Sequence, residues 1–239
     1  MVLRAVCEWG REGARQCAGH AAAVIVVDVL SFSTCIDVAV SRGATVYPFE
    51  SGDFTAASKA ARALGAELAG ARGDTKYRYS LSPISLASIP TGTKLLLPSP
   101  NGSAISAAAH SGTVLAGCLR NARAIAERVA ALAKGGAIAV IPAGEQWPDG
   151  SLRPAIEDLI GAGAILHELD AKCSPEAKIA REAFRYSLPR LANIIRNCVS
   201  GRELIDRGFS EDVEIALSVN TSEATPTLRK GAYCDWPSL

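Results

Sequence analysis

Small and polar residues gather where four apolar segments of this chain end. The segments span residues 24–30, 94–98, 113–116 and 137–142, and such apolar runs are typical of buried parallel strands. The residues at and after their ends include Asp28, Ser31, Ser33, Asn101, Gly102, Ser103, Arg120, Asn121 and Gly144. Because parallel strands present their carboxyl ends at one edge of an open sheet, where ligands bind, we expect these residues to share one rim.

The residue types at this rim fit a phosphate group and a magnesium ion. A helical pattern follows each segment, and a helix N-terminus presents free N–H groups and a positive dipole end to an anion. Carboxylate oxygens are ligands that Mg²⁺ prefers, and Asp28, Glu157 and Asp158 would supply them. Glu157 and Asp158 point about 100° apart on a helix, so at most one is expected to face a metal directly. Arg120 and Arg153 are candidates to neutralise the phosphate, and the whole set suggests phosphoryl chemistry.

Each of these features also has a purely structural explanation. Asp28 could cap the helix that follows it, and Asn101 with Gly102 could form only a turn. Arg120 and Asn121 could begin a solvent-exposed helix. The acidic pair at 157–158 suits the first turn of a helix without any function.

A polar segment, residues 71–88, interrupts the rhythm of strands and helices. A loop of this length inside a compact domain is either functional or mobile. It carries Arg72, Lys76 and Arg78, which could face an anionic ligand or could lie on a solvated surface.

Strand patterns alternate with helical patterns along most of the chain, and residues 45–49 add a further short strand. The helical patterns cover residues 33–42, 54–64, 103–110, 121–134 and 154–169. This alternation predicts a three-layer α/β/α fold with a largely parallel or mixed sheet, as one body or as two intertwined lobes. We expect a single domain over residues 1–239, with a sub-lobe boundary near 143–153.

Two finer expectations concern the sheet and the C-terminal part of the chain. Residues 26–30, 95–97 and 138–141 are expected to be neighbouring strands of one sheet, mostly parallel. From Pro175 onward the pattern is mostly helical, with a late strand-like stretch at 216–220.

Composition excludes several classes of protein. The chain has 25 basic and 24 acidic residues, a balance that argues against a nucleic-acid-binding surface. Its seven cysteines form no CxxC pair, which favours reduced thiols over disulfides or a metal site. The N-terminal residues lack the apolar core of a signal peptide, and no long uninterrupted apolar stretch occurs, so a cytoplasmic protein without a membrane partner is expected. A mean hydropathy of +0.17 is consistent with a buried subunit interface, so a homodimer is one expectation.

The motifs of several other enzyme classes are absent. The sequence contains no GxxxxGK[ST], GxSxG or HExxH, and no GxGxxG follows the first strand. The three histidines, His20, His110 and His167, do not sit at predicted strand ends. A Ser-His-Asp hydrolase and a histidine-based zinc site are therefore disfavoured.

An ordered set of segments resembles the 2-phosphosulfolactate phosphatase family. The segments are VVDVLSFSTCIDVAVSRGA (26–44), LLLPSPNGSA (95–104), AGCLRNARAIA (116–126), IPAGEQWPDGSLRPAIEDLIGAGAI (141–165) and SGRELIDRGFSEDVEIAL (200–217). Each motif alone is short, but their order and spacing match along nearly the whole chain.

The resemblance implies an α/β/α fold and Mg²⁺-dependent hydrolysis of (R)-2-phospho-3-sulfolactate to sulfolactate and phosphate, a step toward coenzyme M. The positions that match the family's motifs are Asp28, Asn101, Gly102, Asn121, Gly144, Glu157, Asp158 and Gly163. On this basis Asp28, Glu157 and Asp158 are expected to hold Mg²⁺. The expected catalytic residues are Asp28, Arg120, Asn121 and Glu157. The residues expected to contact the small anionic phosphorylated substrate are Ser31, Ser33, Asn101, Gly102, Ser103, Gly144 and Arg153.

Two departures from the family pattern bear on the substrate. Ser31 stands where many members carry a basic residue after DVL, and Pro142 stands where many carry a cysteine before AG. The first change leaves the identity of the anion open, and the second rules out an essential thiol there. The alternatives are a phosphatase for a different phosphorylated acid, a homologue that binds anions without turnover, and a nucleotide-handling enzyme. Either a water or a side chain could attack phosphorus.

Overall fold

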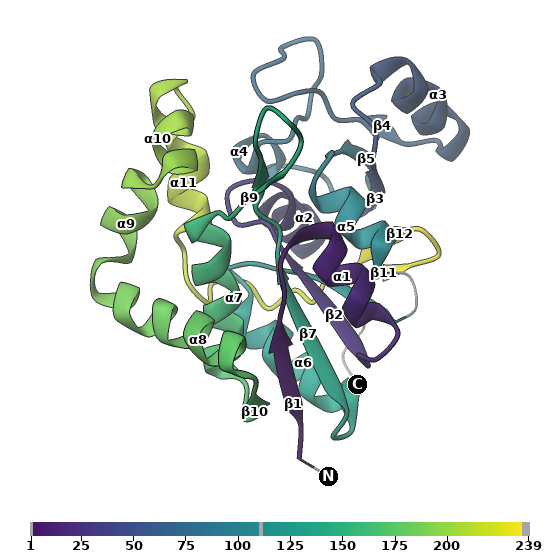
Figure 1. Ribbon diagram of the computed structural model, residues 1–239. Coiled ribbons are helices and arrows are strands. Elements are labelled where there is room, and N and C mark those ends of the chain that lie inside the picture. Colours follow the sequence, from purple (N-terminus) through teal and green to yellow (C-terminus); the bar gives the residue numbers. More distant parts are fainter. Residues whose placement is uncertain (1, 110–111, 236–239) are drawn as a thin grey trace.

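A computed structural model describes residues 2–109 and 112–235 (Figure 1). The strands are β1 (Arg4–Cys7), β2 (Ala23–Val27), β3 (Thr45–Phe49), β4 (Glu67–Leu68), β5 (Lys94–Pro98), β6 (Thr113–Gly117), β7 (Ala137–Pro142), β8 (Glu145–Gln146), β9 (Leu152–Arg153), β10 (Lys172–Cys173), β11 (Thr227–Arg229) and β12 (Ala232–Cys234). The α-helices are α1 (Gly10–Ala18), α2 (Phe32–Ser41), α3 (Phe54–Leu64), α4 (Pro83–Leu86), α5 (Gly102–Ala108), α6 (Ala122–Ala133), α7 (Ile156–Glu168), α8 (Pro175–Ser187), α9 (Leu191–Asn197), α10 (Val199–Asp206) and α11 (Ser210–Ala216), and a 3₁₀ turn, η1 (Leu188–Arg190), links α8 to α9.

Ten strands form one mixed sheet in the order β10-β1-β7-β2-β6-β11-β12-β3-β5-β4. In its first part β10, β1, β7, β2 and β6 are all parallel, with Val27 opposite both Gly117 and Pro142. The β11–β12 hairpin stands between β6 and β3, and its three pairings are all antiparallel. Strands β3, β5 and β4, which are parallel to one another, therefore run opposite to β2 along the sheet.

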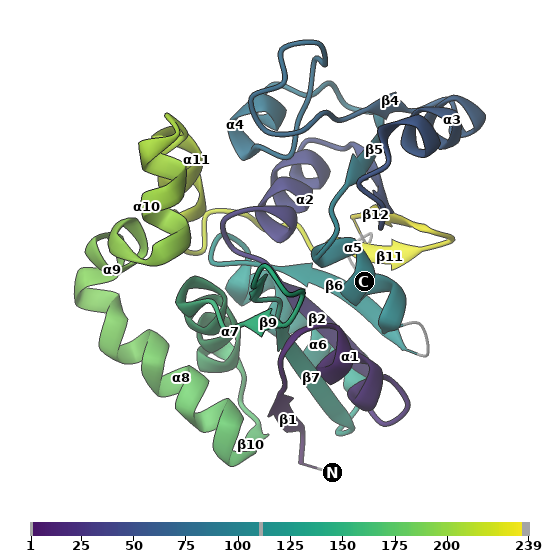
Figure 2. The same cartoon turned by 45° about the horizontal axis from the view of Figure 1, so that its top comes forward.

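The two faces of the sheet carry separate helix layers because side chains alternate along each strand. Val24 and Val26 of β2 belong to a core that includes residues of α1, α2 and α5. Ile25 and Val27 belong to a core that includes residues of α6, α7 and α8. Helices α8 to α11 continue from α7 along one side of the molecule (Figure 2). The expected α/β fold with helices on both faces of a mostly parallel sheet is confirmed.

The joint between α7 and α8 depends on a residue without a side chain. A Cβ built on Gly163 would lie 2.0 Å from the carbonyl oxygen of Ala180 in α8. Only glycine permits this approach, and the joint places the first turn of α7 at the carboxyl ends of β2 and β7.

Most expected elements are confirmed, several at their bounds. The strands at 45–49, 94–98 and 137–142 and the helix at 54–64 are found as predicted. The first strand is shorter than expected, because the chain turns after Val27 and begins α2 at Phe32. The helix expected at 103–110 is α5, and position 110 lies outside the described residues.

One expectation about strands is wrong in part and another is wrong. Strands β2 and β7 are parallel neighbours as expected, but β5, in the same sheet, is separated from β2 by β6, the hairpin and β3. The stretch 216–220 is not a strand, because Leu217 and Ser218 still donate backbone hydrogen bonds to α11 and Asn220 has a positive φ. The late strands are instead β11 and β12, next to each other in a hairpin.

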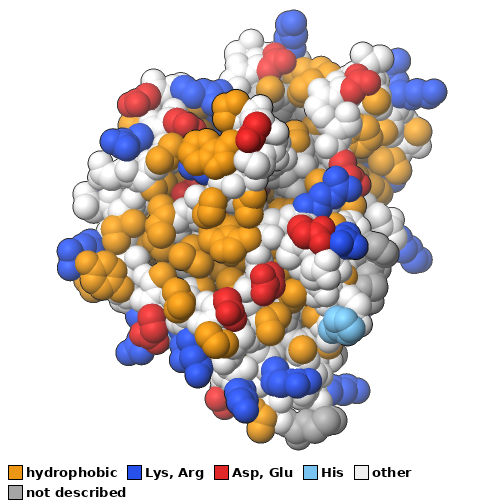
Figure 3. All heavy atoms as spheres, in the orientation of Figure 1, with side chains coloured by type: hydrophobic (Ala, Val, Ile, Leu, Met, Phe, Trp, Pro, Cys, Tyr) orange, Lys and Arg blue, Asp and Glu red, His pale blue; other side chains and the backbone are white. Residues whose placement is uncertain are grey.

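Hydrophobic side chains gather on the face that α7, α8 and the β8–β9 hairpin present in Figure 3. Exposed large side chains of these elements include Trp147, Leu152, Ile156, Ile179 and Tyr186. The homodimer remains a prediction. Within the described part of the chain, no helix combines the length and apolar character needed to cross a membrane.

Candidate active site

Asp28 directly follows β2, in a turn that its neighbours fix. Its backbone N–H donates to the Ser33 hydroxyl at 3.0 Å, and that hydroxyl donates to the Val26 carbonyl at 2.8 Å. The Phe32 N–H at the start of α2 lowers the pKa of the Asp28 carboxylate, against the effect of burial. The Asp28 carboxylate therefore lies at the start of the helix, and Ser33 holds the turn rather than facing a ligand.

The Asp28 carboxylate faces a cavity of about 130 Å³, here called the carboxylate cavity. It is lined by Asp28, Leu30, Ser31, Arg72, Glu145, Glu157, Asp158, Ser200, Glu203, Leu204 and Arg207. One water needs roughly 10–15 Å³ on this measure, so the cavity has room for several waters or for a small anionic group. Residues from the ends of β2 and β7, the start of α7, the polar 71–88 segment and α10 meet here.

Carboxylates outnumber cations around this cavity, with five acidic groups against two guanidinium groups among its lining residues. Burial, and then the nearby Glu145, raise the pKa of Asp28 to about 7, while Arg72 opposes the rise. Burial is also the main cause that raises the pKa of Glu145, with Glu157 adding to it and Arg153 opposing it. A divalent cation would relieve this crowding of negative charge.

The neighbouring residues Glu157 and Asp158 have different surroundings. Asp158 accepts the Val29 N–H at 2.8 Å with one oxygen and the Gly144 N–H at 2.9 Å with the other. Burial raises the pKa of Asp158, and these two donors oppose the rise. Glu157 is 3% exposed and lines the same cavity. Both oxygens of Asp158 already accept backbone N–H groups, so the Glu157 carboxylate is more available to a ligand.

The donor set fits Mg²⁺ in its chemistry. Asp28, Glu145 and Glu157 supply the oxygen ligands that this ion prefers, and they line one cavity. In residues 2–109 and 112–235, however, no three His, Cys, Asp or Glu side chains already lie close enough together to hold a metal ion. Binding would therefore draw the carboxylates closer together.

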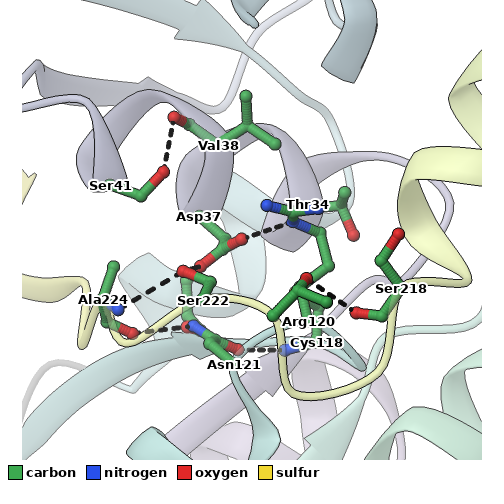
Figure 4. A network of polar contacts seen from close by, with 12 residues as sticks. Thr34, Asp37, Val38, Ser41, Cys118, Arg120, Asn121, Ser218, Ser222 and Ala224 are labelled. Carbon is green, nitrogen blue, oxygen red and sulfur yellow. Dashed lines mark hydrogen bonds and ion pairs between the residues drawn. The ribbon is translucent and has the colours of Figure 1, made fainter.

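Arg120 and Asn121 are engaged in a buried network away from this cavity (Figure 4). The Arg120 Nε donates to Asp37 of α2 at 2.7 Å, and Ser222 donates to the other oxygen of Asp37 at 2.6 Å. The Asn121 amide accepts the Cys118 N–H and donates to the carbonyls of Ala116 and Ala224. These contacts tie the end of β6 to α2 and to the segment before β11, and neither residue lines the carboxylate cavity.

The end of β5 reaches the site from the oppositely running part of the sheet. The Asn101 amide donates to Glu145 at 3.1 Å. Asn101 and Gly144 line a second, larger hollow of about 370 Å³, which also has Trp9, Arg11 and Glu145 among its lining residues. Glu145 therefore lies between the two hollows.

Three further residues expected to bind phosphate are Gly102, Ser103 and Arg153, and none of them lines the carboxylate cavity. The Gly102 N–H donates to the Ser99 hydroxyl at 3.3 Å, and a Cβ on Gly102 would meet the Phe32 ring at 2.2 Å. Ser103 is buried, and its hydroxyl has no hydrogen-bond partner among the described residues. Arg153 donates to Ser200 at 3.2 Å, next to the carboxylate cavity.

Sequence reasoning did not select several residues that line the carboxylate cavity. Glu145 directly follows Gly144 at the end of β7, and its position after a strand end was an available signal. Arg72 had been named only as one of three cations of the polar 71–88 segment that could face an anionic ligand, and not as a site residue. Glu203 lies in α10 and Arg207 directly follows that helix, within the family-like segment 200–217, from which no site residue had been selected.

Comparison with known proteins places the chain in one family. The family model described as 2-phosphosulpholactate phosphatase matches residues 12–231. A protein of Carboxydothermus hydrogenoformans named "Probable 2-phosphosulfolactate phosphatase" is 30% identical over 213 residues, which cover 85% of each chain. A protein of the same name from Pseudothermotoga lettingae is 27% identical over 207 residues, 84% of this chain and 87% of that one. The chain therefore belongs to the 2-phosphosulpholactate phosphatase family.

Proposed function

We propose that this protein is a Mg²⁺-dependent phosphatase that hydrolyses a small phosphorylated acid, with (R)-2-phospho-3-sulfolactate as the first candidate. The observation that carries the proposal is the carboxylate cavity, where Asp28, Glu145 and Glu157 lie beside the Arg72 guanidinium. Oxygen ligands for a hard cation and a fixed positive charge for a phosphate are thus present in one small space.

The residues at the carboxylate cavity would have separate roles in hydrolysis. Asp28 and Glu157 would hold Mg²⁺, which when bound neutralises charge on the phosphoryl group and lowers the pKa of a water. Asp158 keeps the ends of β2 and β7 together, so that the carboxylates stay aligned. Asn101 orients Glu145 at the boundary between the two hollows. The larger hollow would accept the organic part of the substrate.

A screen of phosphate release over small phosphorylated acids, with Mg²⁺ and with a chelator, tests the proposal. We expect release that depends on Mg²⁺ and is fastest for an acid carrying a second anionic group, such as phosphosulfolactate. A control with simple alkyl phosphates measures how much the second anionic group contributes. No release from any acid, with phosphate or sulfonate still bound, would instead establish a homologue that binds anions without turnover.

A further inference from the structure

Arg72 is held more firmly than its place in a loop suggests. Its Nη2 donates to the Leu30 carbonyl at 2.8 Å, and its Nε donates to the Leu81 carbonyl at 2.9 Å. Its side chain is only 11% exposed, and its guanidinium lies 5.7 Å from the centre of the Phe209 ring. The head group is therefore fixed between the turn after β2 and the polar 71–88 segment.

An acidic residue from a distant part of the chain completes this support. Asp212 of α11 is fully buried, and its Oδ2 lies 3.2 Å from the Arg72 Nε. Its Oδ1 accepts the Ser82 hydroxyl at 2.7 Å and the Ile84 N–H at 3.1 Å. One carboxylate thus holds both the guanidinium and the start of α4, with a separate oxygen for each.

The support leaves part of the guanidinium available. Arg72 lines the carboxylate cavity, and its charge opposes the rise in the pKa of Asp28. None of the hydrogen bonds made among the described residues uses its Nη1. A guanidinium that is anchored through some of its donors, keeps another unused and lines a cavity is suited to binding a phosphate there.

We propose that Arg72 binds the phosphoryl group of the substrate in the carboxylate cavity, and that Asp212 is the residue that positions it. This inference rests on the proposed function and deepens it by naming the cation that recognises the phosphate.

The other arginines near the site are less suited to this role. Arg120 is paired with Asp37 and does not line the cavity. Arg153 donates to Ser200 and is not among the residues lining the cavity. Arg207 does line it, but that residue is exposed at the end of α10. Arg72 alone among these four combines burial, anchoring and a place on the cavity wall.

The test compares binding of inorganic phosphate, measured by calorimetry with Mg²⁺ present, in matched variants. Arg72→Met removes the charge, Arg72→Lys keeps the charge without the planar fork, and Asp212→Asn keeps an acceptor for Ser82 and Ile84 while removing the ion pair. The matched controls are Arg196→Met and Glu214→Gln, which break an exposed pair between α9 and α11 with N–O distances of 2.7 Å. Thermal unfolding of every variant separates loss of binding from loss of folding.

We expect Arg72→Met to weaken phosphate binding by at least about tenfold, since charge-assisted hydrogen bonds are lost. Arg72→Lys should recover part of this loss. In assays of phosphate release, Asp212→Asn should raise the KM for the phosphorylated substrate by about threefold to tenfold, with a smaller change in kcat. Both controls should bind phosphate as the unmodified protein does. A folded Arg72→Met protein that binds phosphate normally would overturn the assignment, as would a change in Asp212→Asn confined to thermal stability.

Different results would contradict the proposed phosphatase function and the phosphate-binding role of Arg72. If the unmodified protein hydrolyses no phosphorylated acid but binds phosphate through Arg72, the proposed function is wrong and the inference stands. If hydrolysis occurs and neither phosphate binding nor KM responds to Arg72→Met, the function stands and the inference is wrong. Absence of any phosphate binding by the unmodified protein also contradicts the inference.

Discussion

The Asp158 carboxylate accepts the Gly144 N–H at 2.9 Å, and so joins the first turn of α7 to the turn that follows β7. Its other oxygen accepts the Val29 N–H at 2.8 Å, in the turn that follows β2. One buried side chain therefore links the ends of the two strands that supply Asp28 and Glu145. This arrangement makes Asp158 a structural residue of the site and leaves its neighbour Glu157 free to act on a ligand.

The first prediction separates these two adjacent acids. In Asp158→Asn, the amide NH₂ would oppose a backbone N–H donor, so we expect a loss of stability of about 1–3 kcal/mol. In Glu157→Gln, we expect near-normal stability and a large loss of phosphatase activity, because the residue proposed to hold the metal loses its charge. Chemical denaturation and phosphate release measured on both variants check the contrast. Equal stability losses in the two variants would contradict it.

The second prediction concerns Cys118, which follows β6 and could be mistaken for a nucleophile. The thiol is fully buried, and burial raises its pKa to about 12 with a further contribution from Asp37. Such a thiol is almost entirely protonated near neutral pH and is a poor nucleophile. We expect Cys118→Ser to keep activity within about threefold of the unmodified protein, since the residue lies outside the carboxylate cavity. A folded Cys118→Ser protein without activity would overturn the metal-based mechanism.

Reactivity of the same thiol provides an independent check. Iodoacetamide at pH 8 should leave Cys118 unmodified in the folded protein and should modify it after denaturation. Mass spectrometry of peptides from both samples measures the difference. Rapid modification in the folded state would show that the thiolate is accessible, contrary to the structure.

The central strands could be predicted from the sequence because each is an uninterrupted apolar run. Strands such as β5 and β7 are buried on both faces, so their apolar composition alone identifies them as strands. Strand β1 and the β11–β12 hairpin are short and flanked by charged residues, and their pairing depends on distant parts of the chain. The reversal of β3, β5 and β4 follows from that hairpin, so local sequence carried no sign of it.

The candidate site was predictable where it depends on strand ends and not where it depends on distant contacts. Asp28 and Gly144 follow β2 and β7, which are parallel neighbours. Both residues therefore lie near the cavity, at the edge of the sheet where the two strands end. Arg120 also follows a strand beside β2, but its guanidinium pairs with Asp37, whose other oxygen accepts the Ser222 hydroxyl, so Arg120 supports the fold instead of facing the cavity. Such pairings join residues far apart in the chain, and no local sequence pattern predicts them.

The third prediction is that the metal-free protein loses stability as pH rises from about 4 to about 7. Burial beside Glu145 raises the pKa of Asp28 to about 7, compared with about 3.9 in an unfolded chain. Between these values the folded state holds a proton that the unfolded state has released, so rising pH favours unfolding. The raised pKa values of Glu145 and Asp158 act in the same direction.

Scanning calorimetry at pH 5 and pH 8 in the presence of a chelator measures this effect. We expect the Tm at pH 8 to be lower than at pH 5, and Asp28→Asn to raise the Tm at pH 8 by about 2–4 °C. Added Mg²⁺ should raise the Tm of the unmodified protein at pH 8, because the proposed metal site exists only in the folded state. The same pH dependence in Asp28→Asn as in the unmodified protein would contradict the role of Asp28.

The last prediction tests Asp28 as a metal ligand against Asp28 as a helix cap. Both roles are open to Asp28, because its carboxylate is close enough to the Phe32 N–H for that group to lower its pKa and also faces the carboxylate cavity. Asparagine caps helices about as well as aspartate, but it lacks the charge that a hard cation needs. We therefore expect Asp28→Asn to fold and to lose at least about a hundredfold in turnover, with extra Mg²⁺ restoring only part of it. The matched control is Asp53→Asn, which alters a cap of α3 that accepts the Thr55 N–H at 2.8 Å and should leave turnover unchanged. Near-normal turnover in Asp28→Asn would reduce Asp28 to a cap and leave Glu157 and Glu145 as the residues to test for the metal.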